Sequence, residues 1–600
     1  MSVRSLAQRL ARRVRPSAGV VAPPDFAAAD LYELTWGIPR EYGGMTSVML
    51  QRAHAFHEEL GQAVTILTLD PTVELGAVTA RLRTSGALDD SVTVRNIWHE
   101  LCTSDRAALT RWFGDAELPQ QAIPGQPRHG AEEQIERNRT IFRVDGDIAQ
   151  IRYRRSDGSE CAVDDRTAQG RRLWIIDLDG SALAVFDRMR EFYFAWFDCV
   201  IAGRRAVIIN ESKTVAEFFH RYRRPRVLIC QVLHNAHLAS AADSVFGPYT
   251  PSRRGLIAHS EQFDIMAFLT QQQKDDFEAA FGRSPRNVVL PNARTPSSAG
   301  READRPRASG AGILLGSLET RKRIEDAIDA VIVASARAKE PVTLDIYGAG
   351  PEESALRARV TEAGAETFVR LRGYTEDARA KLRDSSFLLF TSRAEGMGLV
   401  LVEAMAEGCV PLSYDVRYGP SDIITDGVDG FLVNPGDTAE LAQAISSFVM
   451  ADAQVQDQMR AAAVRRAADF DEAKVARAWK TAIDQAWARR KGKGKQLKPV
   501  VVGHVTRSCA EGSEVVEFRL RAPEALPESG YVLDVVADDE LMGGRFPVAC
   551  SASGERLDCS ATVPWSVLPV PRHGEYRLFI RESGARLGLR TRLSTDGEDT

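Results

Sequence analysis

Apolar runs of strand length alternate with amphipathic, helix-length patterns in two separate stretches of the chain. In the first, an apolar run at 26–34 leads through a glycine-containing loop to a helical pattern at 46–60 and an apolar run at 64–69. In the second, six apolar runs between 312 and 433 alternate with helical segments. Such alternation predicts parallel sheets with helices on both faces. We therefore expect two Rossmann-like α/β domains in tandem.

The region inside the first α/β stretch follows a different pattern. Short strand patterns between 140 and 186 are separated by Asp-Gly pairs at 145–146, 157–158 and 179–180. Asp-Gly favours tight hairpin turns, because glycine reaches positive φ at little cost. The pattern predicts an antiparallel sheet inserted into the first domain.

The last hundred residues are rich in strand patterns and follow a lysine- and glycine-rich stretch. The expected fold class is α/β: two Rossmann-like domains with an inserted antiparallel β-sheet and a C-terminal β-sandwich-like domain. The predicted division is a basic tail at 1–25, an N-terminal α/β domain at 26–95 and 200–300, an inserted sheet at 96–199, a C-terminal α/β domain at 310–490, a linker at 491–498 and a β-sandwich-like domain at 499–600.

Composition excludes several classes of protein. The 600 residues are 44% hydrophobic and 26% charged, with a formal net charge of -5. These values argue against a disordered chain and against a globally basic nucleic-acid binder, so no nucleic-acid partner is expected. No uncharged apolar run reaches the length of about 18 residues that a membrane-spanning helix needs.

Cysteine usage and the N-terminal residues bear on the compartment. The eight cysteines form no CxxC pair and are interpreted as buried thiols in a reducing compartment. The first 17 residues lack an apolar signal region, which predicts a cytoplasmic protein. Their five arginines alternate with apolar residues, so peripheral contact with the inner face of a membrane stays an alternative to a frayed tail, which we favour.

Two facing parallel sheets create a cleft at the carboxyl ends of their strands, where ligands bind. Glu395 lies in a glycine-rich loop after a predicted strand, and Glu403 lies about two turns into the following helix. Gly396 and Gly398 allow close approach of an anion to backbone N–H groups at the helix N-terminus. Two hydroxyl-binding carboxylates beside an anion site suit a nucleotide sugar.

At these residues the chain resembles a known family. The Glu-x7-Glu segment from Glu395 to Glu403 is similar to the signature of retaining glycosyltransferases of the GT-B fold, family 4 type. The segment 413–424 resembles the branch that glycosylates teichoic-acid-type poly(polyol phosphate) chains and relatives that glycosylate serine-rich proteins. Members of that branch carry an inserted antiparallel sheet, and the resemblance covers about residues 30–488.

The resemblance implies roles for residues of the C-terminal α/β domain, the expected nucleotide-sugar domain. Glu395 would bind the donor sugar's hydroxyls, and Glu403 the ribose hydroxyls. Lys322 would neutralise the leaving diphosphate. The other donor-binding residues implied are Gly396, Gly398 and Leu399 at the diphosphate and Tyr374 beside the base.

The resemblance also implies residues of the N-terminal α/β domain, the expected acceptor domain. Gly43 and Gly44 match a glycine pair that faces the diphosphate. The segment His234-Asn235-Ala236-His237 matches a strand end that places a catalytic histidine near the acceptor, and we prefer His237 for that role.

One position departs from the family pattern. The chain has Ser317 where the family has an arginine that shares the diphosphate charge. Because stabilisation of leaving-group charge is a large catalytic contribution, another cation is expected to replace it. Candidates are Arg321, Arg323 and Arg393; without such a replacement the enzyme would be slow or the chain would only bind.

No metal site and no cofactor beyond a UDP-sugar co-substrate are expected. Asp177 and Asp179 form a DxD pattern, but they precede a hairpin glycine and are interpreted as turn formers. The predicted function is a metal-independent, retaining transfer from a UDP-sugar to a hydroxyl of a polyol-phosphate, teichoic-acid-like polymer of the cell wall.

Other readings stay open. The acceptor could be a capsule, a lipid-linked glycan or a serine-rich protein. A chain that only binds carbohydrate or polyanion is an alternative from a different class, and the sequence does not decide between a monomer and a homo-oligomer.

Overall fold

The computed structural model describes most of the chain. The described residues are 28–40, 42–113, 122–127, 131–166, 170–239, 242, 245, 248–294, 307–338, 341–375, 377–491, 499, 501–502, 505–510, 513–521, 530–536, 542–564, 577–582 and 591–593. The basic tail, residues 295–306 and nearly all of the predicted linker at 491–498 lie outside them.

The first α/β domain is built on a seven-stranded parallel sheet with the order β13-β12-β11-β10-β1-β2-β3. Its strands are β1 (Asp30–Thr35), β2 (Val64–Thr68), β3 (Val92–Asn96), β10 (Ala206–Asn210), β11 (Val227–Leu233), β12 (Ile265–Phe268) and β13 (Asn287–Val289). Its helices include α2 (Gly44–Leu60), α3 (Leu75–Thr84), α7 (Lys213–Phe219), α8 (Arg254–Ala258) and α9 (Gln271–Phe281). Strands β10 and β11 are buried along their whole length, as strands covered on both faces must be.

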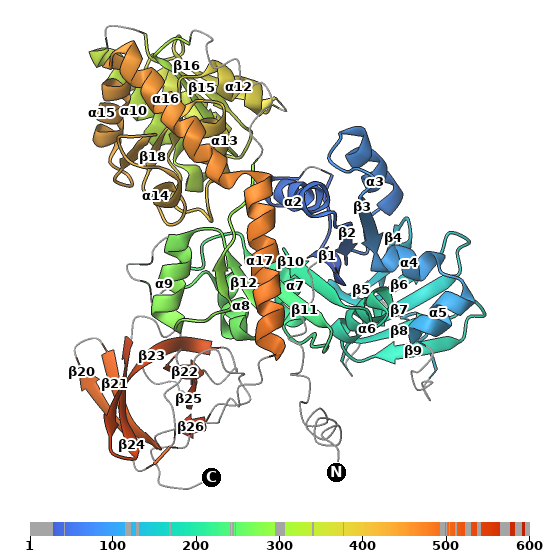
Figure 1. Ribbon diagram of the computed structural model, residues 1–600. Helices are drawn as coiled ribbons and strands as arrows, with labels where there is room; N and C mark the ends of the chain where they lie inside the picture. The colour runs from blue at the N-terminus through green and yellow to red at the C-terminus, as the bar shows by residue number, and fades with distance from the viewer. Residues whose placement is uncertain are drawn as a thin grey trace, which may run out of the picture.

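The inserted sheet interrupts the first domain between β3 and β10. It is antiparallel in the order β4-β5-β6-β7-β8-β9, and Figure 1 shows it beside the first parallel sheet. Its elements are α4 (Ile97–Thr103), α5 (Arg106–Phe113), β4 (Glu132–Glu136), β5 (Arg139–Val144), β6 (Asp147–Arg154), β7 (Glu160–Asp165), β8 (Arg172–Ile176), β9 (Ala182–Phe186) and α6 (Met189–Ile201). Asp145 and Gly146 both have positive φ, as a type I′ turn requires.

The second α/β domain has a six-stranded parallel sheet with the order β16-β15-β14-β17-β18-β19. Its strands are β14 (Ala311–Leu315), β15 (Thr343–Tyr347), β16 (Val369–Gly373), β17 (Phe387–Phe390), β18 (Val410–Tyr414) and β19 (Phe431–Val433). Its helices include α10 (Ile324–Arg337), α11 (Glu353–Glu362), α12 (Ala378–Asp384), α13 (Leu399–Ala406), α14 (Pro420–Ile423), α15 (Thr438–Met450) and α16 (Ala453–Ala467).

The long helix α17 (Glu472–Lys491) leaves the second domain and packs on the first (Figure 1). Trp479 meets Phe56 of α2 edge to face at 6.4 Å. Arg490 pairs with Asp264, just before β12, at 2.7 Å. The chain from 472 to 491 therefore belongs structurally to the first domain, because its apolar face is buried there.

The C-terminal strands form one curled antiparallel sheet in the order β20-β21-β24-β23-β22-β25-β26. They are β20 (Thr506–Ala510), β21 (Ser513–Arg521), β22 (Tyr531–Val536), β23 (Met542–Ser553), β24 (Arg556–Pro564), β25 (Arg577–Glu582) and β26 (Thr591–Leu593). Side chains from both ends of this sheet pack together in one hydrophobic core. Strand β23 joins the two ends, because its first half pairs with β22 and its second half pairs with β24.

A buried ionic network attaches this sheet to the first α/β domain. Asp534 accepts from Arg545 at 2.8 Å and from Arg581 at 2.6 Å, and both arginines reach Glu261 of the first domain.

The predicted fold class is confirmed. No helix in the described part of the chain is both long and apolar enough to cross a bilayer.

Candidate functional site

The two α/β domains meet at the carboxyl ends of their sheets. A Cβ added to Gly396 of the second domain would lie 1.8 Å from the carbonyl oxygen of His234 in the first, so only glycine permits this approach. Nearby, Asp422 accepts a hydrogen bond from the backbone N–H of Gln271, at the start of α9, at 2.8 Å. The glycine-rich loop thus lies directly against the first domain.

Glu395 is held by its own backbone and by two cations. Its N–H donates to the carbonyl of Arg417 at 3.1 Å, and its carbonyl accepts from the N–H of Tyr418 at 2.9 Å. One carboxylate oxygen contacts Lys322 Nζ at 2.5 Å and Arg321 at 3.2 Å. The side chains of Glu395 and Lys322 are 13% and 17% exposed. The structure therefore brings together two of the residues that the sequence predicted.

Lys322 ends a short 3-10 turn, Thr320–Lys322, that follows β14. Its carbonyl accepts from the hydroxyl of Thr391 at 2.8 Å, which ties this turn to the end of β17. Its ammonium lies 5.8 Å from the centre of the Phe390 ring. These contacts present the cation at the carboxyl edge of the sheet, where an anion could replace the Glu395 carboxylate.

Gly398 caps helix α13, which begins at Leu399. Its φ is +81°, a conformation that side chains other than glycine rarely adopt. An added Cβ would also lie 3.1 Å from the Phe390 ring. The first N–H groups of α13 lack helical partners, and with the helix dipole they favour a bound anion.

Glu403 forms an ion pair with an arginine that the sequence did not predict. Arg294 contacts its carboxylate at 2.7 Å. The backbone N–H of Arg294 donates to the carbonyl of Phe470, close to the start of α17. Arg294 lies 5 residues after β13, in the segment leading out of the first domain. No local sequence pattern marks it, because the contact joins residues more than a hundred positions apart.

Three other predicted residues border solvent or open space. Tyr374 follows β16 and is 76% exposed. A Cβ added to Gly43, the residue before α2, or to Gly44, the first residue of α2, would meet no atom within 4 Å. The loop before α2 therefore leaves room for a ligand against its backbone.

The two histidines of the 234–237 segment differ sharply. His237 is 0% exposed, and neither ring nitrogen has a hydrogen-bond partner among the described residues. It stacks on Tyr418 at 5.6 Å and meets Phe277 edge to face. Burial lowers its pKa to about 3. In this structure His237 is a neutral, packed side chain.

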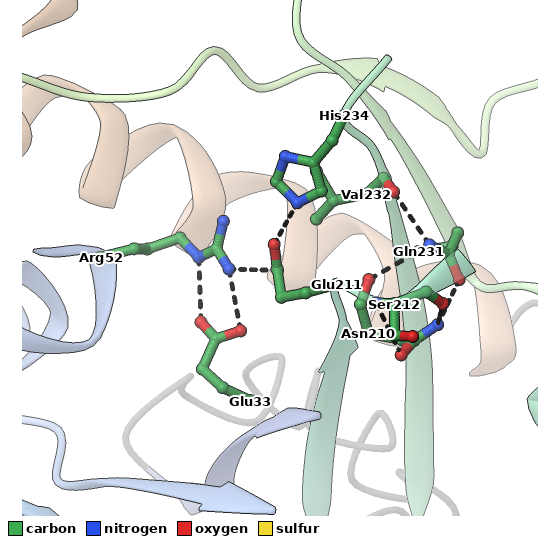
Figure 2. A network of polar contacts seen from close by, with 8 residues as sticks. All are labelled: Glu33, Arg52, Asn210, Glu211, Ser212, Gln231, Val232 and His234. Carbon is green, nitrogen blue, oxygen red and sulfur yellow. Dashed lines mark hydrogen bonds and ion pairs between the residues drawn. The ribbon is translucent and has the colours of Figure 1, made fainter. Parts of the chain in front are cut away.

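His234 instead ends a buried chain of charges, drawn in Figure 2. Its Nε2 contacts Glu211, whose other oxygen contacts Arg52 of α2. Arg52 also donates two hydrogen bonds, of 2.9 and 2.8 Å, to the carboxyl group of Glu33 in β1. Glu211 is the first residue after β10, so a polar residue following an apolar strand was the available sequence signal.

Burial and charge separate the two carboxylates of this network. Burial, offset in part by Arg52, raises the pKa of Glu33 to about 8. Burial also opposes ionisation of Glu211, but Arg52 and His234 outweigh it and lower the pKa of Glu211 to about 2. Glu33 therefore binds a proton more readily than Glu211, and Glu211 is the more acidic carboxyl group of the network.

The predicted replacement for the missing arginine can be followed in the structure. Of the three candidates, Arg321 contacts Glu395. Arg323 pairs with Asp326 at 3.7 Å, and Arg393 is bonded to this turn only through its backbone N–H, which donates to the Arg321 carbonyl. Arg321 thus lies where it can share an anion with Lys322.

The DxD pattern forms a turn. Asp179 accepts from the N–H and hydroxyl of Ser181, and Arg106 contacts both aspartates at 3.0 Å. Within the described ranges, no group of three or more His, Cys, Asp or Glu side chains is placed to hold a metal ion.

A hollow of about 460 Å³ lies between the inserted sheet and the loops that follow β1 and β2. Arginine and aromatic side chains line it: Arg139, Arg143, Arg166, Arg171, Trp36, Trp98, Tyr153 and Tyr193. Arg139 pairs with Glu136, and Asp164 is shared by Arg166 and Arg171. The four arginines outnumber the carboxylates of Glu136 and Asp164, and aromatic rings lie in the same lining as the arginines.

Comparison with known sequences identifies relatives. Residues 312–450 match the family described as glycosyl transferases group 1. The chain is 20% identical over 511 residues to a poly(glycerol-phosphate) alpha-glucosyltransferase of Bacillus subtilis (strain 168), covering 76% of this chain and 75% of the relative. It is 32% identical over 195 residues to the GtfA subunit of a UDP-N-acetylglucosamine–peptide N-acetylglucosaminyltransferase of Streptococcus gordonii, covering 32% of this chain and 38% of that protein.

Solved structures share the fold. The crystal structure of TarM superposes with a TM-score of 0.60 at 16% identity, covering 76% of this chain and 99% of TarM. The pneumococcal O-GlcNAc transferase GtfA, in complex with UDP and GlcNAc, gives a TM-score of 0.53 at 18% identity, with coverage of 76% and 99%. The comparisons thus identify residues 312–450 as a segment of the glycosyl transferases group 1 family, and the chain has the GT-B fold.

Proposed function

We propose that this chain is a retaining glycosyltransferase that moves a sugar from a UDP-sugar to a hydroxyl of a polyol-phosphate or related glycan polymer. The observation that carries the proposal is the cluster of Lys322, Arg321 and Glu395 beside the N-terminus of α13. It combines two cations and oriented N–H groups for a diphosphate with a carboxylate for sugar hydroxyls.

Donor binding would open the pair between Lys322 and Glu395. The diphosphate would take the ammonium of Lys322, the guanidinium of Arg321 and the N–H groups near Gly398 and Leu399. Glu395 would then be released to orient the sugar and stabilise positive charge developing at the reacting carbon. A partly exposed pair suits this exchange, because solvent screens it and little free energy holds it closed.

The nucleoside would lie along α13. Glu403 would accept from the ribose hydroxyls, with Arg294 holding the carboxylate in place, and Tyr374 would border the base. The acceptor would enter past Gly43 and Gly44 and attack the face from which the diphosphate leaves. The departing phosphate oxygen would take the acceptor proton, and an α-linked donor would yield an α-linked product.

Metal-independence follows from the same cluster. Lys322, Arg321 and the dipole of α13 would supply the positive charge that a divalent ion supplies in other transferases.

The arginine- and aromatic-lined hollow supports an anionic acceptor. Guanidinium groups bind phosphates, and aromatic faces pack against sugar rings. The hollow lies beside the carboxyl edge of the first sheet, on the side from which an acceptor would approach. Protein glycosylation is the second candidate, favoured by the similarity to a peptide N-acetylglucosaminyltransferase subunit.

A donor screen tests the proposal. The full-length protein would be incubated with UDP-glucose, UDP-N-acetylglucosamine and UDP-galactose, and UDP release would be measured without and with poly(glycerol phosphate). We expect release from one donor, its loss in Lys322→Ala and its retention in Lys480→Ala. Donor binding without any turnover would favour a binding protein, and a β-linked product in the anomeric NMR spectrum would refute retention.

A further inference from the structure

We propose that His234, and not His237, presents the imidazole that contacts the reacting groups, and that Glu211 is its positioning residue. This inference rests on the proposed function. It assigns the acceptor-side histidine, and it adds a buried carboxylate that fixes the geometry of that histidine.

Among the described residues, the side chain of His237 is fully enclosed and reaches no solvent. Its ring is fully buried between Tyr418, which stacks on it, and Phe277 and Phe281, which meet it edge to face. A ring that faces aromatic side chains on several sides contributes packing, and the cost of charging it there keeps it neutral.

His234 lies at the boundary with the Glu395 loop. Its carbonyl oxygen touches the backbone at Gly396, the residue after Glu395. It follows the last residue of β11, at the carboxyl edge of the sheet where ligands bind in α/β folds. Figure 2 shows Nε2 directed at Glu211 and the other ring nitrogen turned away from it.

Glu211 is held from both sides. One of its oxygens contacts Arg52 and the other contacts Nε2 of His234. Rotation of the carboxylate would break both contacts inside a region where Glu211 is 3% exposed. Its position is therefore set by the strand β10 and by α2 together, before any ligand binds.

This arrangement determines what the imidazole can do. Because Glu211 is ionised, Nε2 carries hydrogen and donates to it. The neutral ring then offers Nδ1 as an acceptor to a hydroxyl, and the protonated ring offers an Nδ1–H donor. Either form can orient a sugar or acceptor hydroxyl, and a carboxylate behind a histidine is a recurring way to hold such a ring.

Glu33 provides a matched control. It lies in the same buried network and contacts Arg52, but it does not contact His234. Glu33→Gln changes the same buried network but leaves the contact between Glu211 and His234 in place. A merely structural role of the network would make Glu33→Gln and Glu211→Gln behave alike.

The test is a double-mutant cycle on UDP release, using the donor accepted in the screen above and poly(glycerol phosphate). We expect His234→Gln and Glu211→Gln each to lower kcat about tenfold to a hundredfold, with KM for the donor little changed. The double variant should fall no further than His234→Gln, within about threefold. Glu33→Gln and His237→Phe should keep kcat within about threefold of wild type.

Other outcomes overturn the inference. Additive losses in the double variant, equal losses in Glu33→Gln and Glu211→Gln, or a greater loss in His237→Phe than in His234→Gln would each refute it. If Glu211→Gln does not fold, Glu211→Asp, which keeps the charge, carries the same cycle. A wild-type protein that releases no UDP from any donor refutes the proposed function and this inference together.

Discussion

The two halves of the cleft hold their charges in opposite ways. On the second domain, Lys322, Arg321 and Glu395 form a cluster on loops, and the Arg321 side chain is 50% exposed. On the first domain, Glu33, Arg52 and Glu211 are buried, and Arg52 satisfies both carboxylates. Under the proposed function, the partly exposed cluster would exchange partners with a ligand more easily than the buried one. The donor side would then rearrange on binding, and the acceptor side would be set before the ligand binds.

The largest effect should come from breaking the buried network. Arg52→Ala leaves two buried carboxylates without their shared cation and should cost about 3–5 kcal/mol. A fall in the midpoint of urea unfolding, followed by circular dichroism, would measure it. Arg477→Ala, which removes an exposed pair with Glu59, is the control and should cost less than about 1 kcal/mol. Equal losses would contradict the contrast between the two halves.

On the exposed side, Lys322→Ala should lower kcat about a hundredfold to a thousandfold through lost stabilisation of the leaving diphosphate. Unfolding midpoints should stay close to wild type, because the ammonium is partly solvated and its partner carboxylate can rehydrate. UDP release and urea titrations on the same preparation check both parts. A large loss of stability with intact turnover would reverse the interpretation of this cluster.

Arg321→Ala tests the replacement for the missing family arginine. Loss of one shared, half-exposed cation should reduce kcat about tenfold. Restoring the family residue in the double variant Ser317→Arg/Arg321→Ala should recover part of the loss. No change in either variant would show that Lys322 and the helix N-terminus suffice.

Two arginines of the hollow test whether the acceptor binds on the first domain. Arg143→Gln with Arg171→Gln should raise KM for poly(glycerol phosphate) about threefold to tenfold, more at low salt. UDP release without acceptor should not change. Arg172→Gln, on the same sheet but outside the hollow, is the matched control. An equal rise in KM for Arg172→Gln would indicate a non-specific charge effect.

The smallest expected effect concerns His237 and pH. Its pKa is about 3 in the folded protein and near 6.5 when unfolded, so the unfolded chain binds more protons between these values. Stability should therefore fall as pH drops from about 6.5 towards 3. His237→Phe should flatten this slope in urea unfolding measured at pH 7, 6 and 5. An unchanged slope would mean that His237 is solvated in solution.

Local patterns were enough for much of the fold. Apolar runs such as 64–69 and those between 312 and 433 became parallel strands, because strands that are buried on both faces are largely apolar. The Asp145–Gly146 pair became a hairpin turn because glycine and aspartate tolerate positive φ. The strand–loop–helix pattern singled out Glu395 and Gly398 as candidates, whereas Lys322 was implied only by the family resemblance.

Other features needed contacts between distant positions. The choice between His234 and His237 depended on Glu211 and on the aromatic residues around His237. The pair of Arg294 with Glu403 joins residues more than a hundred positions apart. The packing of α17 on the first domain joins residues separated by the whole second domain.

By itself, the sequence determined which segments become strands, where the chain turns and which loop can receive an anion. These properties depend on neighbours within about ten residues, through backbone preference and the burial of one face. The tertiary structure alone decided which charges are buried, which histidine is paired with a carboxylate and which is packed among aromatic rings. Desolvation and ion pairing depend on atoms that meet only after the chain has folded, so the pKa is raised at Glu33 and lowered at Glu211 although both are glutamates.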